Sequence, residues 1–463
     1  MKIPRNIFIV IPGLLVVAAW ACSFRPKLNK QKEVVEKYKN FQWTSDKFSD
    51  TSNKKTYTYL NTASINISSQ GSDAWWSIFN DPVLDSLESL ALQENLDIQF
   101  SIARIHETRS MVHLAMADLF PSIILQPGVV KQELSSNRPN PFAVGTGTLP
   151  RTTISTFQIP LNFNYEIDLW GKYRSNVQSA RANFMASEED MKALRLSVSG
   201  DVASNYFLIR IADIQMDLLE KAVETRRQNL KLTEERFRAG LISQLDIAQA
   251  ETDLQTLQSQ FYDLRISRQR VEHALAVLCG ASSSGFSISG KNYSLLLPEI
   301  PPGVPSDLLK RRPDILRQEL VMEATNASIG IYAASRFPSL VLTGSGGTLS
   351  KSFSTLPDYQ SRTWTLGMGI AIPVFQGRRI SANIQAAKAR YEQAIATYEK
   401  QILIAFQEVE DVLSNLTQKK EQAILQESII KIATETAELS RERYSKGLIT
   451  YFEVLNNERA ALS

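Results

Sequence analysis

The hexapeptide FPSIIL at positions 120–125 returns as FPSLVL at positions 337–342, a shift of 217 residues. Farther along, RFRAGLIS at 236–243 returns as RYSKGLIT at 443–450, now with a shift of 207. The two copies therefore keep register on either side of one insertion of about ten residues. Repeats of this length are expected to fold as two similar supersecondary units that share a core.

Each copy also contains a segment in which apolar and other side chains alternate. In the first copy, apolar residues occupy every second position from Phe157 to Leu169. Most positions between them are polar: Gln158, Asn162, Asn164, Glu166 and Asp168. The second copy repeats the pattern from Trp364 to Val374, with small or polar residues between. Because successive side chains of a strand point to opposite faces, one face would be apolar and would meet either lipid in a membrane barrel or a second sheet in a soluble sandwich.

The number of strands bears on the choice between those two folds. The expected strands span 122–132, 152–169, 339–349 and 362–374. Each is long enough to cross a bilayer when tilted, but four strands are too few to close a barrel in which every edge is paired. A barrel would therefore require further copies of the chain, and three copies would supply twelve strands.

Long helices are predicted where proline is missing, between Pro160 and Pro298 and again after Pro373. In the first of these stretches Val177 and Val198 belong to a seven-residue apolar repeat, which is typical of a coiled-coil seam. A continuous helix from about 171 to 237 would be about 100 Å long at 1.5 Å per residue. Each long helix is expected to turn back at a glycine, into a return helix that in the first copy spans 244–278.

A shorter helix is expected to open each repeat. It begins with proline in its first turn, at Pro82 in one copy and Pro313 in the other, and ends just before the repeated hexapeptide. Each half of the chain is thus read as helix, two strands, long helix and return helix.

The N-terminus has the pattern of an export signal, with Lys2 and Arg5 before an uncharged run from 7 to 21. The following Cys22 resembles the acylated cysteine of a bacterial lipoprotein, which implies lipidation at that residue; a plain secretory cleavage is the alternative. Positions 22–71 are polar and weakly periodic, as expected for an extended lead-in. The other cysteine, Cys279, then has no partner within the chain, so a disulfide framework is excluded.

Composition argues against two other classes of function. The net charge is +3 and the cations form no basic stripe, which argues against a nucleic-acid binder. Only three histidines occur, two of them His106 and His113 on one expected helix, so no metal site is predicted. We find no nucleophile elbow, phosphate-binding glycine loop or paired-cysteine motif, and we therefore expect neither catalytic residues nor a cofactor.

Four motifs occur in order along the chain: DPVL at 81–84, YEIDLWGK at 165–172, IPPGVPSDLLKRRPDI at 300–315 and PVFQGRR at 373–379. With them the chain resembles an outer-membrane factor of the TolC family, in the NodT-like lipoprotein branch. The resemblance implies an α+β membrane protein that forms a homotrimer. Its twelve-stranded transmembrane β-barrel, four strands per subunit, would continue into a long α-helical coiled-coil barrel.

The resemblance also implies partners. The channel would be the passive exit duct of a tripartite efflux system, docked to a periplasmic adaptor and an inner-membrane pump of the RND type, and lipid-anchored in the outer membrane of a Gram-negative bacterium. Two alternatives remain open, an exit channel for type I protein secretion and a periplasmic coiled-coil adaptor or scaffold. An adaptor would be expected to lack the four spanning-length strands.

Specific residues are implied by position. The periplasmic gate would involve polar and acidic side chains at the hairpin tips: Glu453, Asn456, Tyr444, Thr450 and Asp246. The adaptor would dock on the turns themselves: Gly240, Leu241, Ile242, Ser243, Gly447, Leu448 and Ile449. In the barrel, the residues expected to face the lumen are Asn162, Asn164, Glu166 and Asp168.

The expected domains follow from the repeat. They are a signal peptide (1–21), a lipid anchor with its lead-in (22–71), a first repeat (72–280), an inter-repeat linker (281–305) and a second repeat (306–463). By the shift of 207, the counterpart of Leu278 falls more than twenty residues beyond Ser463. The last helix is therefore expected to be incomplete in this sequence, or to leave a gap that exposes seam residues such as Leu455.

Overall fold

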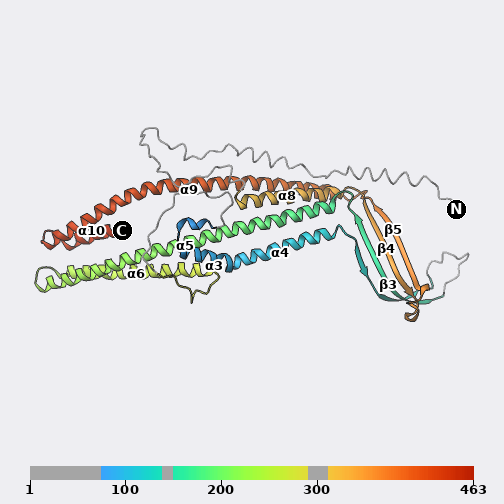
Figure 1. Ribbon diagram of the computed structural model, residues 1–463, viewed down its shortest axis with the longest axis horizontal. Helices are drawn as coiled ribbons and strands as arrows, with labels where there is room; N and C mark the ends of the chain where they lie inside the picture. The colour runs from blue at the N-terminus through green and yellow to red at the C-terminus, as the bar shows by residue number, and fades with distance from the viewer. Residues whose placement is uncertain (1–73, 138–149, 290–310) are drawn as a thin grey trace, which may run out of the picture. The chain divides into compact units, whose positions relative to one another are not determined.

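The computed structural model describes residues 74–137, 150–289 and 311–463 (Figure 1). The expected signal peptide, Cys22, the lead-in and most of the linker lie outside the described residues. The chain divides into two compact units, and each takes residues from both repeats. One unit includes Arg104–Glu189 and Asp314–Gln401, and the other includes Asp190–Pro313 and Ile402–Ser463.

The first unit contains an antiparallel sheet whose strands follow the order β1-β3-β4-β5, with β2 also paired to β3. The bounds are β1 Ser122–Leu125, β2 Gly128–Leu134, β3 Thr152–Ile167, β4 Ser339–Ser350 and β5 Arg362–Ala371. The four predicted strand positions are confirmed, and the first strand is divided into β1 and β2. The division falls at Gln126 and Pro127, because proline has no N–H to give to a ladder.

The register of the sheet places most apolar side chains of β3 and β5 on one face, together with Ile123 and Leu125 of β1. Directly paired residues lie on the same face of a sheet, so each row of partners can be followed across the strands. Two rows on the apolar face are Ile123, Phe163, Gly344 and Leu366, and Leu125, Leu161, Gly346 and Trp364. A row on the opposite face is Ser122, Asn164, Thr343 and Gly367. The predicted alternation therefore extends over β3 and β5, whereas β2 places Lys131 and Glu133 on the apolar face and Val130 on the other. On the apolar face Trp364 is 80% exposed.

The helices confirm most of the predicted bounds. The long helices are α5 Lys172–Arg238 and α9 Arg379–Ser445, each of 67 residues. The return helices are α6 Gln244–Leu278 and α10 Tyr451–Leu462. The second repeat has apolar residues with the same seven-residue spacing, and all of them are buried: Ile384, Ala387, Tyr391, Ala394 and Tyr398. Among the described residues, no helix has the length and apolar character needed to cross a membrane.

The short helix of the second repeat is α8 Pro313–Ala334, as expected, but that of the first repeat is two helices, α3 Pro82–Glu94 and α4 Leu96–Ala117. The prediction of one helix there was wrong because Asn95 serves as a cap for both pieces. Its Oδ1 accepts hydrogen bonds from the backbone N–H groups of Asp97 and Ile98, and its Nδ2 donates to the carbonyl of Leu278 at 2.9 Å. Asparagine competes with the helical backbone in this way.

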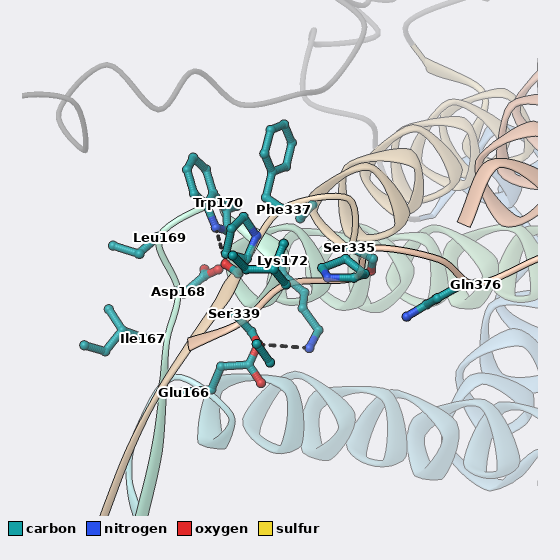
Figure 2. Close-up of a pocket in the computed structure, with 15 residues that line it drawn as sticks. Glu166, Ile167, Asp168, Leu169, Trp170, Lys172, Ser335, Phe337, Ser339 and Gln376 are labelled. Carbon is teal, nitrogen blue, oxygen red and sulfur yellow. Dashed lines mark hydrogen bonds and ion pairs between the residues drawn. The ribbon is translucent and has the colours of Figure 1, made fainter. Parts of the chain in front are cut away.

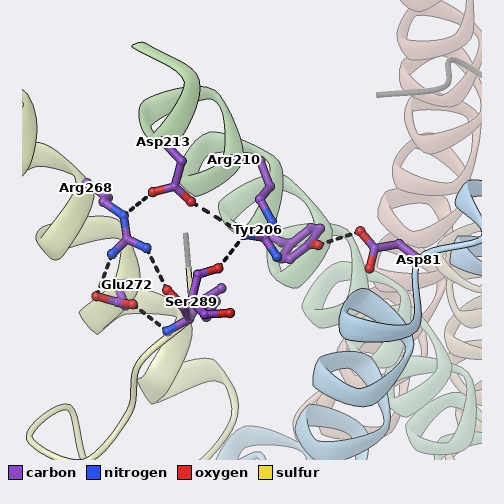
Figure 3. A network of polar contacts seen from close by, with 8 residues as sticks. Asp81, Tyr206, Arg210, Asp213, Arg268, Glu272 and Ser289 are labelled. Carbon is purple, nitrogen blue, oxygen red and sulfur yellow. Dashed lines mark hydrogen bonds and ion pairs between the residues drawn. The ribbon is translucent and has the colours of Figure 1, made fainter. Parts of the chain in front are cut away.

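The second unit has a core between α3, α5 and α6 that includes Leu84, Val202, Tyr206 and Leu275. Beside it lies a polar network (Figure 3). The Tyr206 hydroxyl donates to Asp81, which also caps the start of α3 through Val83 and Leu84.

Two arginines of this network hold the chain that leaves α6 (Figure 3). Arg210 donates to the carbonyl of Ser289 at 2.9 Å, and Arg268 donates to that of Ile288 at 2.8 Å. Glu272 accepts from the Ile288 N–H at 2.7 Å. The N–H and carbonyl of the buried Ile288 are both bonded in this way, so neither is left unsatisfied in the interior.

The seam residue Leu455 does not have the exposure expected from the shortness of the last helix. It is 3% exposed and packs with Ala250 and Tyr451. The expectation that it would be exposed was wrong, because the first turns of α10 pack against α6 rather than depending on residues farther along the helix.

Candidate functional site

The hairpin tips are built in the same way in both repeats. Gly240 and Gly447 have φ of +70° and +73°, in the left-handed region that glycine adopts without steric cost. At the first tip, the N–H of Leu241 donates to the carbonyl of Arg236, and that of Gly240 donates to Phe237. The second tip has the equivalent pair of bonds. This is the Schellman arrangement, which satisfies the last carbonyls of a helix and reverses the chain.

Each tip presents leucine to solvent at the same place. Leu241 is 73% exposed and Leu448, its counterpart, is 69% exposed. One turn into each return helix, Leu245 and Phe452 are also more than half exposed. The residues predicted as a docking surface thus lie around two repeated apolar patches, while the half-buried Ile242 and Ile449 lie beneath them.

Asp246, one of the predicted gate residues, has a local structural role. Its Oδ2 accepts from the backbone N–H and the hydroxyl of Ser243, at 2.9 and 2.8 Å. This is the acidic half of a capping box at the start of α6. The carboxylate is therefore already engaged by groups of its own hairpin.

The other predicted gate residues divide into an exposed and a packed group. Glu453 and Asn456 are exposed on α10, three residues apart and so on one face of the helix, and Thr450 is exposed at the N-cap position. Tyr444 instead packs against Tyr451, with ring centroids 5.6 Å apart. Burial raises the pKa of the Tyr451 phenol to about 12.

The two hairpin tips are joined by Arg236, which the sequence did not single out. Its guanidinium lies 4.7 Å from the centre of the Tyr444 ring and donates to the carbonyls of Tyr444 and Ser445, at 3.4 and 3.5 Å. A cation is favourable at a helix C-terminus, and the aromatic face adds to the attraction. The first hairpin therefore caps the end of the long helix of the second.

Farther from the tips, a buried ion cluster joins four helices. Arg226 on α5 contacts Asp253 on α6 and Glu458 on α10, and all three side chains are less than 5% exposed. Arg441 on α9 donates to Glu458, and Arg459 on α10 donates to Asp253 at 2.7 Å. Arg226 and Arg459 each reach from one hairpin to the other. Because a buried carboxylate is costly without partners, the cluster holds α10 against the first hairpin.

At the other end of α5, the predicted lumen-facing carboxylates lie where the sheet meets the helices (Figure 2). Glu166 accepts from Lys172 at 3.2 Å and from the hydroxyl of Tyr173 at 2.8 Å. Asp168 accepts from the backbone N–H and the Nε of Arg174, at 2.9 and 3.3 Å. These carboxylates are paired with cations, and Asp168 also satisfies an N–H in the first turn of α5.

A cavity of about 350 Å³ lies at this junction. Beside it the Trp170 ring stacks on Phe337 at 4.8 Å, and its Nε1 donates to the carbonyl of Pro338 at 2.7 Å (Figure 2). This contact joins the end of β3 in one repeat to the start of β4 in the other. The other two predicted lumen-facing residues, Asn162 and Asn164, lie farther along β3 on the face opposite to the apolar rows.

Comparison with known proteins agrees with this architecture. The sequence profile of the outer membrane efflux protein family matches residues 87–281 and 304–463. The toluene efflux pump outer membrane protein TtgI of Pseudomonas putida is 31% identical over 390 residues, covering 83% of this chain and 81% of the relative. The cation efflux system protein CusC of Escherichia coli is 28% identical over 389 residues, covering 83% and 82%.

Solved structures give the same result. The CmeC outer membrane channel of Campylobacter jejuni superposes with a TM-score of 0.80 at 26% identity, covering 84% of this chain and 82% of that one. A membrane protein of Pseudomonas aeruginosa gives 0.77 at 29% identity, covering 84% and 88%. Paired long helices with glycine turns and a sheet apolar on one face are thus the features of an efflux channel of the outer membrane. This chain belongs to the outer membrane efflux protein family.

Proposed function

We propose that three copies of the chain form one channel, in which the sheets close a twelve-stranded barrel and the helices continue it as a tube. The observation that supports this most directly is the sheet of one copy. Its two outer strand positions pair on one side only among the described residues, and its apolar face is open to solvent in the isolated protomer. A transmembrane barrel would cover that face with lipid and would pair those edges.

The proposed domains follow the repeat, with a signal peptide at 1–21, an anchor and lead-in at 22–71, repeats at 72–280 and 306–463, and a linker at 281–305. The duplication is supported by the equal lengths of α5 and α9 and by the identical construction of the two tips. Acylation at Cys22 would attach the protein to the outer membrane by a second means.

The proposed duct is passive and receives its cargo at the tips. There the exposed Leu241 and Leu448 patches would dock a periplasmic adaptor, which links the duct to an inner-membrane pump of the RND type. The repetition of the patches in both hairpins supports this, because three copies would present six similar sites to a ring of adaptors. Glu453 and Asn456 would narrow the mouth, since they are exposed side by side on α10.

Conductance in planar lipid bilayers tests the channel and its gate together. The detergent-extracted protein is expected to run as a trimer and to form ion-conducting pores. Replacing Glu453 with Ala is expected to raise the conductance, because the shorter side chain would widen the narrow mouth that Glu453 is proposed to form. Unchanged conductance would remove Glu453 from the gate, whereas a folded protein that ran as a monomer and conducted nothing would contradict the channel itself.

A further inference from the structure

The sheet contains three of the four strand pairings that two repeats can make. Two join strands of the same repeat: β1 and β2 with β3, and β4 with β5. The third joins the repeats, as β3 pairs with β4. The fourth would pair β5 with β1 and β2, which lie at opposite edges of the sheet.

The strand pair of the first repeat and the strand pair of the second repeat have the same register. In the first repeat Ser122 pairs with Asn164, and in the second Ser339 pairs with Ala371. The first strands are related by a shift of 217 and the second strands by a shift of 207, the same two shifts that relate the repeats in the sequence. The register of one strand pair can therefore be transferred to its counterpart.

We infer that β5 of one copy pairs with β1 and β2 of the next copy in the register of β3 with β4, an inference that rests on the proposed trimer. A pair is transferred by adding 207 to its β3 residue and subtracting 217 from its β4 residue. The pair Tyr165 and Leu342 then places Ile372 opposite Leu125 of the next copy. Transferring Asn164–Thr343 places Ala371 opposite Gln126. Two further pairs on the apolar face follow in the same way: Val374 opposite Ile123, and Met368 opposite Val129.

The faces of the strands provide an independent check. Across the boundary, the transferred register puts Met368, Ile372 and Val374 opposite Val129, Leu125 and Ile123, and so continues the apolar rows there. Toward the other end of β5 it puts Leu366 opposite Lys131 and Trp364 opposite Glu133. In the isolated protomer Val374 is 92% exposed and Ile123 is 62% exposed. A slip of one residue would place Ile372 opposite Ile124 or Gln126, on the other face. The alternation thus excludes odd slips, and the repeat selects among the remaining registers.

Pro127 leaves one gap in the proposed ladder between copies. The N–H of its neighbour Gln126 donates inward to the carbonyl of Pro160 at 3.0 Å, so the next residue along the strand faces the outer edge. Proline there cannot donate, and the transferred register places it opposite Ile370 of the other copy. The proposed pairing therefore lacks one ladder bond at that point.

Disulfide cross-linking tests the register in the full-length protein. The pairs I372C with L125C and A371C with Q126C place cysteines opposite each other across the boundary. Matched controls are I372C with I123C, displaced by two residues, and A371C with I124C, displaced likewise. A two-residue displacement moves the partner by about 7 Å, which exceeds the reach of a disulfide. The native Cys279 is buried, and burial raises the pKa of its thiol to about 11, so it serves as an unreactive background.

Oxidised membranes are analysed by denaturing electrophoresis without reductant. We expect the two matched pairs to give dimer and closed-trimer bands with at least tenfold more product than their controls. Stronger cross-linking in a control pair would overturn the register and leave the trimer intact. If no pair cross-linked, the register would fall. If the protein still ran as a trimer in size-exclusion chromatography, the trimeric assembly would remain supported. If it ran as a monomer, the proposed channel would be refuted as well.

Discussion

Replacing Glu458 with Gln tests whether the buried ion cluster holds the two hairpin tips together. The side chain is 3% exposed and contacts Arg226 from one hairpin and Arg441 from its own. Glutamine keeps the shape but removes the negative charge, which leaves the buried Arg226 with Asp253 alone. Asp253 already accepts from Arg459.

The size of the expected destabilisation depends on how exposed the partners of Glu458 are. Breaking a buried ion pair by removing one partner costs about 3 to 5 kcal/mol. Arg441 is half exposed and recovers its hydration, so the loss is concentrated on Arg226. We therefore expect the lower end, about 3 kcal/mol, which is about a hundredfold in an opening equilibrium. The expected change is local to α10 and its contacts.

Hydrogen exchange of the α10 amides in the purified protein measures that opening. Glu458→Gln should lower their protection about a hundredfold relative to wild type. The matched control is Glu453→Gln on the same helix, where the side chain is exposed and the expected change is within about 0.5 kcal/mol. Equal protection in the two variants would refute the reasoning, because a buried and an exposed carboxylate would then be equivalent.

Two further predictions concern a buried acid and a turn. Glu88 is fully buried, and burial raises its pKa from 4.5 to about 8, so the carboxyl keeps its proton in the folded protein. Its contribution to the free energy of unfolding is complete below the unfolded pKa and declines as pH rises toward 8. Between pH 4.5 and 7 wild type should lose about 3 kcal/mol relative to Glu88→Gln in urea unfolding followed by circular dichroism, and parallel pH curves would contradict this. Gly447→Ala, at positive φ, should destabilise by about 1 kcal/mol in the same assay, whereas Gly200→Ala inside α5, where a Cβ meets nothing within 4 Å, should stabilise by about 0.5 to 1 kcal/mol.

Much of the helical architecture could be predicted because its signals are local. The bounds of α6, Gln244–Leu278, follow from the glycine turn before it and from a proline-free apolar pattern. The sheet face could be predicted for the same reason, since period two is visible in the sequence and the register simply aligns it. The residues of both turns were located from Gly240 and Gly447 alone.

Features that depend on distant contacts could not be predicted. The division between α3 and α4 arises at Asn95, whose side chain bonds to Leu278, far away in the sequence. Asp246 was predicted as a gate residue because it is acidic and lies near the hairpin tip. The structure shows instead that its carboxylate bonds to Ser243 in a capping box. A periodic pattern predicts which face of a helix is buried, but it does not predict which distant residue contacts a given polar side chain.

The ion cluster shows how the two repeats differ in function despite their likeness. Glu458 and Glu251 occupy the same place in the repeat, yet Glu458 is buried and Glu251 is exposed. The counterparts of Arg226 and Asp253 are both alanine, at Ala433 and Ala460. In the proposed trimer, the boundary between the second hairpin and the next copy would therefore lack both the arginine and one carboxylate of the cluster.

The two kinds of hairpin boundary should then differ in strength. The boundary within a copy has buried ion pairs whose loss is costly, while the proposed boundary between copies would lack the counterparts of Arg226 and Asp253. When the tips move apart, the hairpins of one copy should therefore stay together and the copies should separate. Spin labels on exposed Glu251 and Asn456 would report one distance within a copy and another between copies. If opening changed the distance within a copy more than the distance between copies, the buried cluster would not govern the motion.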